Sequence, residues 1–334
     1  MISAMISKHV YAEFKPRIDS FLKENAVDVR FEHPVDSAEA VTSDAPIDAA
    51  FLTLDIRHSP TRLKQFVERI SASPRFKWVH FPGSGVSQHK WLIPLVARGV
   101  RVSTSTGANA ESVATTALTG LLMLSRRGPK WIDGQRSRQW LPWEEPESPA
   151  DLAGQTALIV GMGSIGCRIG RYLKMLGMHV VGVRRSGRHV DDIADTIEHP
   201  DRLPQLLPNC DWLILACSLT DETYHLMDAR AFSLMKSSAY VINISRGDVM
   251  DEPAFVEAVR SHTIAGGYLD VFAQEPLPAD SPVWALPDVI VSPHIAALSL
   301  GNKWRSTEIF IHNLARFSRN EPLINEMPNE LLRT

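Results

Sequence analysis

Cysteine is scarce in this sequence of 334 residues, which contains only Cys167, Cys210 and Cys217. No two of them have the Cys-x-x-Cys spacing. The pattern argues against both a disulfide framework and a zinc site, and we expect three reduced thiols that pack against their neighbours. We expect no metal site elsewhere in the chain.

Long hydrophobic runs and an excess of charge are also missing. No apolar stretch approaches the length that spans a bilayer, and residues 1–8 lack the basic leader and hydrophobic core of a secretion signal. Lys and Arg number 35 against 38 Asp and Glu, which gives a net charge of −3. Composition thus offers no general reason to expect nucleic-acid or membrane binding. We expect a cytoplasmic protein whose partners are small molecules.

Apolar strand-like runs do recur, and helical patterns separate most of them. The runs in the second half are 155–160, 178–183, 211–216, 239–244, 264–271 and 288–292. This alternation predicts an α/β fold with a doubly wound parallel sheet of the Rossmann type. Two earlier runs, 49–54 and 76–81, flank a helical stretch from Leu63 to Ile70. They predict a smaller α/β domain before the larger one.

A glycine-rich string follows the first run of the second half. Gly161, Gly163 and Gly166 form Gly-x-Gly-x-x-Gly between that run and a helical pattern, which is the context that a dinucleotide fingerprint requires. The three glycines permit a tight turn, close approach of the pyrophosphate and close helix–strand packing, in that order. Ser164 and Ile165 open the helix, whose N-terminus offers N–H donors to phosphate. The alternative is a bare turn with structural glycines.

The acidic residue that usually binds the ribose 2′-hydroxyl is absent after the second of these runs. Arg184, Arg185, Ser186 and Arg188 stand there instead. Guanidinium groups form charge-assisted, often bidentate hydrogen bonds to phosphate. The segment therefore predicts a 2′-phosphate site and NADP(H) in preference to NAD(H). A solvated basic loop that tolerates either cofactor is the open alternative.

Three charged or titratable residues follow later runs, where the carboxyl ends of parallel strands face the ligand crevice. They are Arg246 in Asn-Ile-Ser-Arg-Gly, Glu275 in Asp-Val-Phe-Ala-Gln-Glu-Pro, and His294 in Pro-His-Ile-Ala. With the fingerprint, these motifs occur in the order of the D-isomer-specific 2-hydroxyacid dehydrogenases. The chain resembles that family from about Pro82 to Asn325.

The resemblance implies a reductase that converts a 2-keto acid to a D-2-hydroxy acid. His294 would supply the proton, Glu275 would orient the imidazole, and Arg246 would grip the substrate carboxylate. Taken singly, each has a simpler interpretation: a satisfied histidine, a solvated turn or a strand-end salt bridge. The three together outweigh those interpretations.

Further contacts are implied by the same resemblance. Backbone N–H groups of Ser84, Gly85 and Val86 would complete the carboxylate site, although this segment could be only a turn. Asp270 would fix the nicotinamide carboxamide. The remaining predicted cofactor contacts are Ser218, Thr223, Ile244, Arg246 and His294.

Domain boundaries and assembly also follow from the family. Residues 1–104 and 293–334 would form a flavodoxin-like substrate-binding domain, and 105–292 the Rossmann domain. A helix at 109–126 and an arm, together about 108–150, match the family's dimer contact, so we expect a homodimer. Trp140 and Trp143 lie on the arm and either shape the substrate pocket or anchor the interface.

Some positions depart from the family pattern and leave the cofactor and substrate fit open. Ser84, Thr115 and Ser218 replace a common alanine, glutamate and proline, and Ala297-Leu-Ser299 replaces a glycine-containing run. Arg184 replaces a common aspartate, as in NADPH-preferring glyoxylate and hydroxypyruvate reductases. Glyoxylate or hydroxypyruvate is therefore the expected substrate.

Two rival functions share the scaffold. One is a non-catalytic dinucleotide-sensing protein, such as the transcriptional corepressors that carry the same Arg-Glu-His set. The other is an NAD-dependent D-2-hydroxyacid dehydrogenase for another substrate. Phosphoglycerate oxidation is disfavoured because Arg184 argues against NAD and no C-terminal regulatory domain is recognisable.

Overall fold

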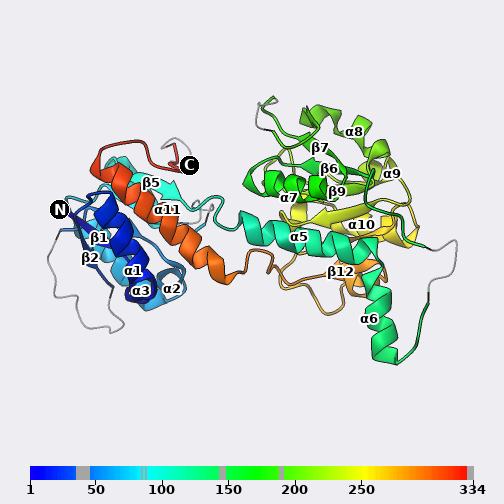
Figure 1. Cartoon of the computed structure of the whole chain (residues 1–334), viewed down its shortest axis with the longest axis horizontal. Helices are drawn as coiled ribbons and strands as arrows, with labels where there is room; N and C mark the ends of the chain where they lie inside the picture. Colours follow the sequence, from blue (N-terminus) through cyan, green and yellow to red (C-terminus); the bar gives the residue numbers. More distant parts are fainter. Residues whose placement is uncertain (35–45, 84–85, 87–88, 143–147, 188–191, 329–334) are drawn as a thin grey trace. The chain divides into compact units, whose positions relative to one another are not determined.

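The computed structural model describes residues 1–34, 46–83, 86, 89–142, 148–187 and 192–328. The chain divides into two compact units, which we describe separately (Figure 1). Unit 1 comprises Met1–Ala108 and Ser299–Thr334, and unit 2 comprises Asn109–Leu298. The sequence placed these boundaries a few residues earlier, after 104 and 292. Within the described residues, no helix combines the length and apolar character needed to cross a membrane.

Unit 1 contains a five-stranded parallel sheet with the order β2-β1-β3-β4-β5. The strands are β1 (Ile2–Met5), β2 (Val29–Glu32), β3 (Ala49–Phe51), β4 (Trp78–Phe81) and β5 (Arg101–Thr104). The helices are α1 (Lys8–Glu24), α2 (Leu54–Arg57), α3 (Pro60–Ala72), α4 (Ile93–Ala97) and α11 (Leu300–Ser318), with a 3-10 turn at Lys90–Leu92. This strand order is that of flavodoxin-like folds.

Both faces of the unit 1 sheet are buried, because successive strand residues point to opposite sides. On β4, Trp78 joins the cluster that contains Phe310 of α11, whereas Val79 joins the cluster that contains Phe66 of α3. The Trp78 and Phe310 rings stack with centroids 5.2 Å apart. The C-terminal helix therefore completes a core that the N-terminal strands begin.

A histidine lies inside this core. His80 is fully buried, and its Nδ1 and Nε2 atoms lie 2.8 and 2.9 Å from the hydroxyl oxygens of Ser103 and Ser105. The indole N–H of Trp78 donates to the Ser103 hydroxyl oxygen at 2.8 Å. Burial lowers the pKa of His80 to about 3, so the ring is neutral at physiological pH.

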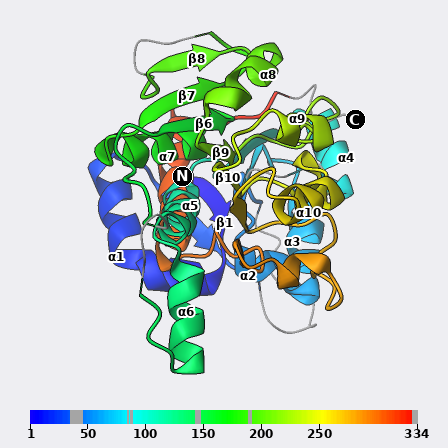
Figure 2. The ribbon, with the colours of Figure 1, turned by 90° about the vertical axis from the view of Figure 1, so that its right-hand side faces the viewer.

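Unit 2 contains a seven-stranded parallel sheet with the order β12-β11-β10-β9-β6-β7-β8. The strands are β6 (Thr156–Val160), β7 (His179–Val183), β8 (Thr196–Glu198), β9 (Trp212–Leu215), β10 (Tyr240–Asn243), β11 (Gly266–Leu269) and β12 (Val289–Val291). Figure 2 shows β8, β7, β6, β9 and β10 following one another across this unit.

Helices pack on both faces of the unit 2 sheet, so its central strands are mostly apolar on both sides. The helices are α5 (Ala110–Ser125), α6 (Gly128–Ser137), α7 (Ser164–Met175), α8 (Leu203–Leu206), α9 (Ala229–Ser233) and α10 (Glu252–Arg260). Short 3-10 turns lie at Pro200–Arg202, Leu207–Asn209, Gly247–Val249 and Pro282–Ala285. On β9, Leu213 and Leu215 belong to one core cluster and Ile214 to the other.

The predicted Rossmann-type sheet and the smaller flavodoxin-like unit are both confirmed. Each apolar run of the sequence contains a strand, but the run at 49–54 was extended too far, because β3 ends at Phe51 and α2 begins at Leu54. Four strands were not predicted: β1, β2, β5 and β8. Each is short and contains polar or charged residues, so no apolar run of the sequence marks it.

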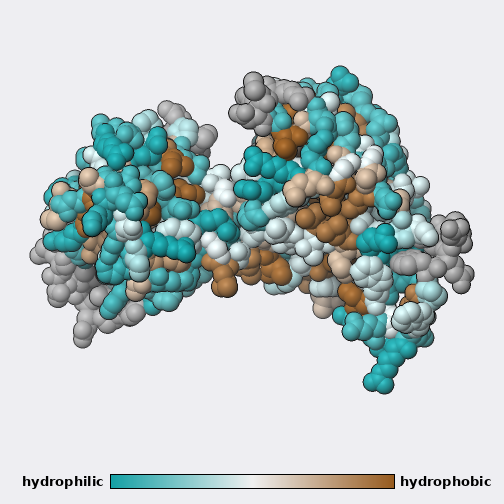
Figure 3. Space-filling view, viewed as in Figure 1, coloured by the Kyte–Doolittle hydropathy of each residue, from teal (hydrophilic) through white to brown (hydrophobic). Residues whose placement is uncertain are grey.

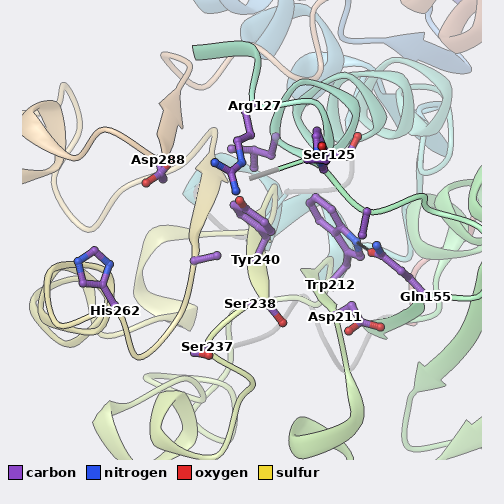
Figure 4. A pocket seen from close by; sticks show the side chains of 15 residues that line it. Ser125, Arg127, Gln155, Asp211, Trp212, Ser237, Ser238, Tyr240, His262 and Asp288 are labelled. Atoms are coloured by element: carbon purple, nitrogen blue, oxygen red, sulfur yellow. Dashed lines mark hydrogen bonds between the residues drawn. The ribbon is translucent and has the colours of Figure 1, made fainter. Parts of the chain in front are cut away.

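A cavity of about 630 Å³ lies at the amino-terminal edge of the unit 2 sheet. Figure 4 shows Trp212 and Tyr240 side by side in it, with ring centroids 4.9 Å apart. Arg127, His262 and Asp288 also line it. Trp212, Tyr240 and Asp288 stand at or just before the starts of strands, so the cavity lies at the edge opposite the predicted cofactor residues.

Candidate active site

The three predicted catalytic residues lie at the carboxyl-terminal edge of the unit 2 sheet. Arg246 follows β10, Glu275 follows β11 and His294 follows β12, and these three strands are neighbours. His294 and Glu275 are bonded, with 2.7 Å between Nδ1 and Oε2. The fold therefore brings together two residues that are separated by 19 positions in the sequence.

Glu275 is held as a carboxylate. Its second oxygen, Oε1, accepts a hydrogen bond from the Phe272 N–H at 3.0 Å. Burial alone would raise the pKa of Glu275, but the bonds from His294 and Phe272 and the nearby Arg246 charge together lower it. An ionised Glu275 accepts the Nδ1 proton of His294, which leaves Nε2 as the imidazole nitrogen that can exchange a proton with a substrate.

A buried aspartate fixes the turn that carries His294. His294 has a left-handed φ of 53°, and its N–H donates to the Asp270 carbonyl at 2.8 Å. The Asp270 carboxylate, 1% exposed, accepts bonds from the Ser292 hydroxyl and from the N–H groups of Ile295 and Ala296. Sequence reasoning missed this positioning of His294. The expected bond from Asp270 to a nicotinamide carboxamide stays a prediction.

Arg246 is exposed on a turn that its motif builds. The Asn243 amide donates to the Arg246 carbonyl at 3.2 Å, and its oxygen accepts from the N–H and hydroxyl of Ser245. At Gly247 a Cβ would lie 1.9 Å from the carbonyl carbon of Phe272, so only glycine lets this turn approach the next one. The sequence contained Asn243 and Gly247 in the motif but gave them no role.

The glycine string forms the expected turn between β6 and α7. Gly161 has φ 103°, and a Cβ on Gly166 would lie 2.1 Å from the Gly161 carbonyl oxygen. At Gly163 a Cβ would meet no atom within 4 Å, which leaves open space beside the backbone. No side chain caps α7, which begins at Ser164 followed by Ile165. Its first N–H groups are thus available to an anion such as a pyrophosphate.

The basic segment after β7 has carboxylate partners. Arg184 forms a bidentate pair with Asp192 at 2.8 and 2.6 Å, and also donates to the carbonyls of Ser186 and Gly187. Arg185 is exposed and lies 3.5 Å from Glu222. The sequence gave no signal for Asp192 as a partner. Arg188 lies outside the described residues.

The other predicted cofactor contacts also lie after the central strands of unit 2. The Thr223 hydroxyl donates to the Ser218 carbonyl at 2.7 Å and closes the turn after β9. Ile244 is buried directly after β10. The structure thus brings Ser218, Thr223 and Ile244 to the edge where the glycine turn lies.

The predicted substrate segment belongs to unit 1. Ser84 and Gly85 lie outside the described residues, whereas Val86 is buried in the unit 1 core. Of the arm tryptophans, Trp140 is 94% exposed and Trp143 is outside the described residues. Unit 2 therefore contains the predicted catalytic residues and the described predicted cofactor residues, and their roles, like that of Val86, stay predictions.

Comparison with known proteins identifies the family. Residues 118–296 fit the family described as D-isomer specific 2-hydroxyacid dehydrogenase, NAD binding domain. The chain belongs to this family. A glyoxylate reductase of Korarchaeum cryptofilum is 33% identical over 71% of this chain and 71% of its own. The human glyoxylate reductase/hydroxypyruvate reductase is 32% identical over 73% of each chain.

A solved structure of a D-isomer specific 2-hydroxyacid dehydrogenase from Xanthobacter autotrophicus has a similar fold. It is 26% identical, covers 99% of this chain and 98% of its own, and has a TM-score of 0.71. That protein was crystallised in complex with NADPH and MES. This likeness covers both units, and the Korarchaeum and human relatives support the glyoxylate reductase-like branch of the family.

Proposed function

We propose that the protein is an NADPH-dependent reductase that converts a small 2-keto acid, such as glyoxylate or hydroxypyruvate, to a D-2-hydroxy acid. The bonded pair of His294 and Glu275, with Arg246 at the same sheet edge, carries the proposal. A proton donor beside a guanidinium is what reduction of a keto acid requires from the protein.

In this mechanism a bound nicotinamide would supply the hydride, and the protein binds the substrate and supplies the proton. Arg246 binds the substrate carboxylate and polarises the carbonyl that accepts the hydride. His294, protonated at Nε2, gives that proton to the carbonyl oxygen. Glu275 keeps the ring oriented through Nδ1 and stabilises the charged imidazolium before the transfer.

Two observations support NADPH as the cofactor. The glycine turn and the uncapped N-terminus of α7 suit a pyrophosphate, and Arg185 offers an exposed guanidinium near the end of β7. The Xanthobacter relative was crystallised with NADPH. NAD(H) fits the same turn without using Arg185 and is the alternative.

The substrate class rests on the relatives. The proteins from Korarchaeum and human bear the names of glyoxylate and hydroxypyruvate reductases. Both acids are small, and both combine a carboxylate with an adjacent carbonyl, which are the two groups that Arg246 and His294 address. Bulkier keto acids of the family are the competing substrates.

We also propose a homodimer assembled through α5 and the arm. Figure 3 shows hydrophobic side chains gathered near α5 on the visible face of unit 2. Leu122 of α5 is 39% exposed, and Trp131, Ile132 and Trp140 are exposed on and after α6. Exposed aromatic and aliphatic residues in one region are typical of a protein interface.

A cytoplasmic location is part of the proposal. Cys167, Cys210 and Cys217 are free thiols, and burial raises the pKa of Cys210 to about 12 and that of Cys217 to about 11. Unpaired, unreactive thiols are typical of a reducing compartment.

The test is the loss of reduced-nicotinamide absorbance when the purified protein is mixed with a 2-keto acid. Glyoxylate, hydroxypyruvate, pyruvate and bulkier keto acids are each assayed with NADPH and with NADH. Faster loss with NADPH and one of the first two acids is expected. Tight cofactor binding without turnover of any acid would instead indicate the dinucleotide-sensing protein.

A further inference from the structure

The Arg184 guanidinium is almost fully engaged within the protein. Its Nη1 and Nη2 donate to the two oxygens of Asp192 at 2.8 and 2.6 Å. Nε donates to the Ser186 carbonyl at 3.1 Å, and Nη2 donates to the Gly187 carbonyl at 2.6 Å. These bonds use four of the five N–H groups of a guanidinium. Little of the hydrogen-bonding capacity of Arg184 is left for a ligand.

The pair with Asp192 is also buried and electrically balanced. The side chain of Arg184 is 14% exposed and that of Asp192 is 5% exposed. Separating the pair would break two charge-assisted hydrogen bonds between largely buried groups, which is strongly unfavourable. We therefore expect the pair to persist when a cofactor binds, and its two charges cancel toward a nearby phosphate.

Arg184 instead shapes the turn that follows β7. Its side chain holds the carbonyls of Ser186 and Gly187 on one side, and its backbone N–H donates to the Glu198 carbonyl of β8 at 3.1 Å. One residue thus ties together its own turn, the neighbouring strand and Asp192.

Arg185, the next residue, is exposed to solvent and forms a surface ion pair. Its side chain is 68% exposed and lies 3.5 Å from the carboxylate of Glu222, which is 71% exposed. A surface ion pair of this kind is weak and screened by solvent. A phosphate dianion can displace Glu222 and take a charge-assisted hydrogen bond from Arg185.

We propose that Arg185 is the direct ligand of the cofactor 2′-phosphate, and that Arg184 and Asp192 are positioning residues that hold the turn from which Arg185 reaches it. This inference rests on the proposed function, because it presupposes that NADPH is the cofactor. The sequence predicted that Arg184 binds the 2′-phosphate, whereas this inference makes Arg184 a positioning residue.

The test measures binding, not turnover. The fluorescence of NADPH and of NADH is titrated with the wild type, Arg185→Gln and Asp192→Asn. Asp195→Asn is the matched control, because Asp195 lies in the same connection but bonds Lys174 and the Val180 N–H. Thermal melting of each variant checks that it is folded.

We expect Arg185→Gln and Asp192→Asn each to weaken NADPH binding about tenfold or more and to leave NADH binding within about twofold. Asp195→Asn should change neither. A general structural defect would weaken both cofactors equally, so the ratio of the two dissociation constants isolates the positioning role. Arg184→Lys keeps the charge but loses the planar fork, and it should weaken NADPH as Asp192→Asn does.

Tighter NADPH binding by Asp192→Asn would overturn the inference, because Arg184 would then be a ligand that Asp192 restrains. Unchanged NADPH affinity in Arg185→Gln would overturn it as well. Because Arg185 is exposed, this variant should fold and can decide the question even if Asp192→Asn does not fold. Wild type that binds NADPH no tighter than NADH would reject the cofactor preference and the inference together. If the protein binds NADPH more tightly than NADH but reduces no 2-keto acid, the proposed enzymatic activity would be rejected and the role of Arg185 would stand.

Discussion

At the scale of single residues, the site is built from pairs in which one partner has a proposed catalytic or binding role and the other holds it in place. Glu275 holds His294, Asn243 holds the turn of Arg246, and Asp270 holds the backbone around His294. The supporting residues are more buried than the residues that they support. Substitution of a supporting residue should therefore displace the residue that it holds.

His294→Ala should lower kcat by about 10²–10⁴, because it removes the proton donor and leaves the glycine turn intact. Steady-state rates and a fluorescence titration of NADPH measure the two properties. His262→Ala is the matched control, since His262 lines the cavity at the other edge of the same sheet. A near-normal rate for His294→Ala would reject His294 as the acid.

Acid should destabilise the protein through His80. Its pKa is about 3 in the folded state against 6.5 for the free side chain, so between these values the unfolded chain binds the proton and the folded chain does not. This contribution to stability is complete above pH 6.5 and falls with pH by about 1.4 kcal/mol per unit until pH 3.

Urea unfolding at pH 6.5 and pH 5 should therefore show a loss of about 2 kcal/mol in the wild type that is absent in His80→Asn. His9→Asn serves as the control, because His9 is exposed at the surface. Equal pH dependence in wild type and His80→Asn would mean that other groups cause the acid sensitivity.

At the scale of elements, two glycines of the turn between β6 and α7 have different roles: Gly166 is needed for packing, and Gly163 leaves space for the proposed cofactor. Gly166→Ala should lower the free energy of unfolding by roughly 1–3 kcal/mol, because its Cβ would strike the Gly161 carbonyl oxygen. Gly163→Ala should leave stability unchanged, since its Cβ meets no protein atom. It should instead weaken NADPH binding by about tenfold or more, by filling the space beside the backbone.

Thermal melting and cofactor titration of these two variants provide the measurement, and each variant is the control for the other. Loss of stability in Gly163→Ala would show that the open space has a structural role. Normal stability of Gly166→Ala would show that the helix can move away from the turn.

The elements also show what the sequence could and could not predict. The long apolar runs and the glycine string predicted the Rossmann-type sheet and its turn, because periodicity and glycine placement are local signals. Strands β1, β2, β5 and β8 contain polar or charged residues such as Arg30, Arg101 and Glu198, so no apolar run marks them. Sequence motifs identified Arg246, Glu275 and His294 as candidates. No motif or spacing indicated that Asp192 would form an ion pair with Arg184.

At the scale of the whole molecule, the residues of the proposed chemistry belong to unit 2, whereas the predicted substrate segment belongs to unit 1. The chain passes from unit 1 to unit 2 after Ala108 and returns after Leu298. The return follows His294 by four residues (298 − 294). The turn held by Asp270 therefore also begins the second connection between the units.

The proposed dimer predicts a light-scattering mass near twice the 37.1 kDa of the chain. Leu122→Arg should yield monomers, because a charge within an apolar contact is not compensated. Met175→Arg, at the exposed end of α7, is the control and should stay dimeric. A wild type that elutes and scatters as a monomer would contradict the proposed assembly.

Unit 1 is discontinuous, and this determines when it can be completed during synthesis. Trp78 and Phe51 stack against Phe310 of the C-terminal helix, and the side chain of Asn313 bonds the Ile324 backbone. On the ribosome, residues 1–108 emerge first but lack this part of their core until the last helix has left the exit tunnel. Unit 2, a continuous segment, has all its residues before α11 emerges, so unit 1 begins before unit 2 and is completed after it.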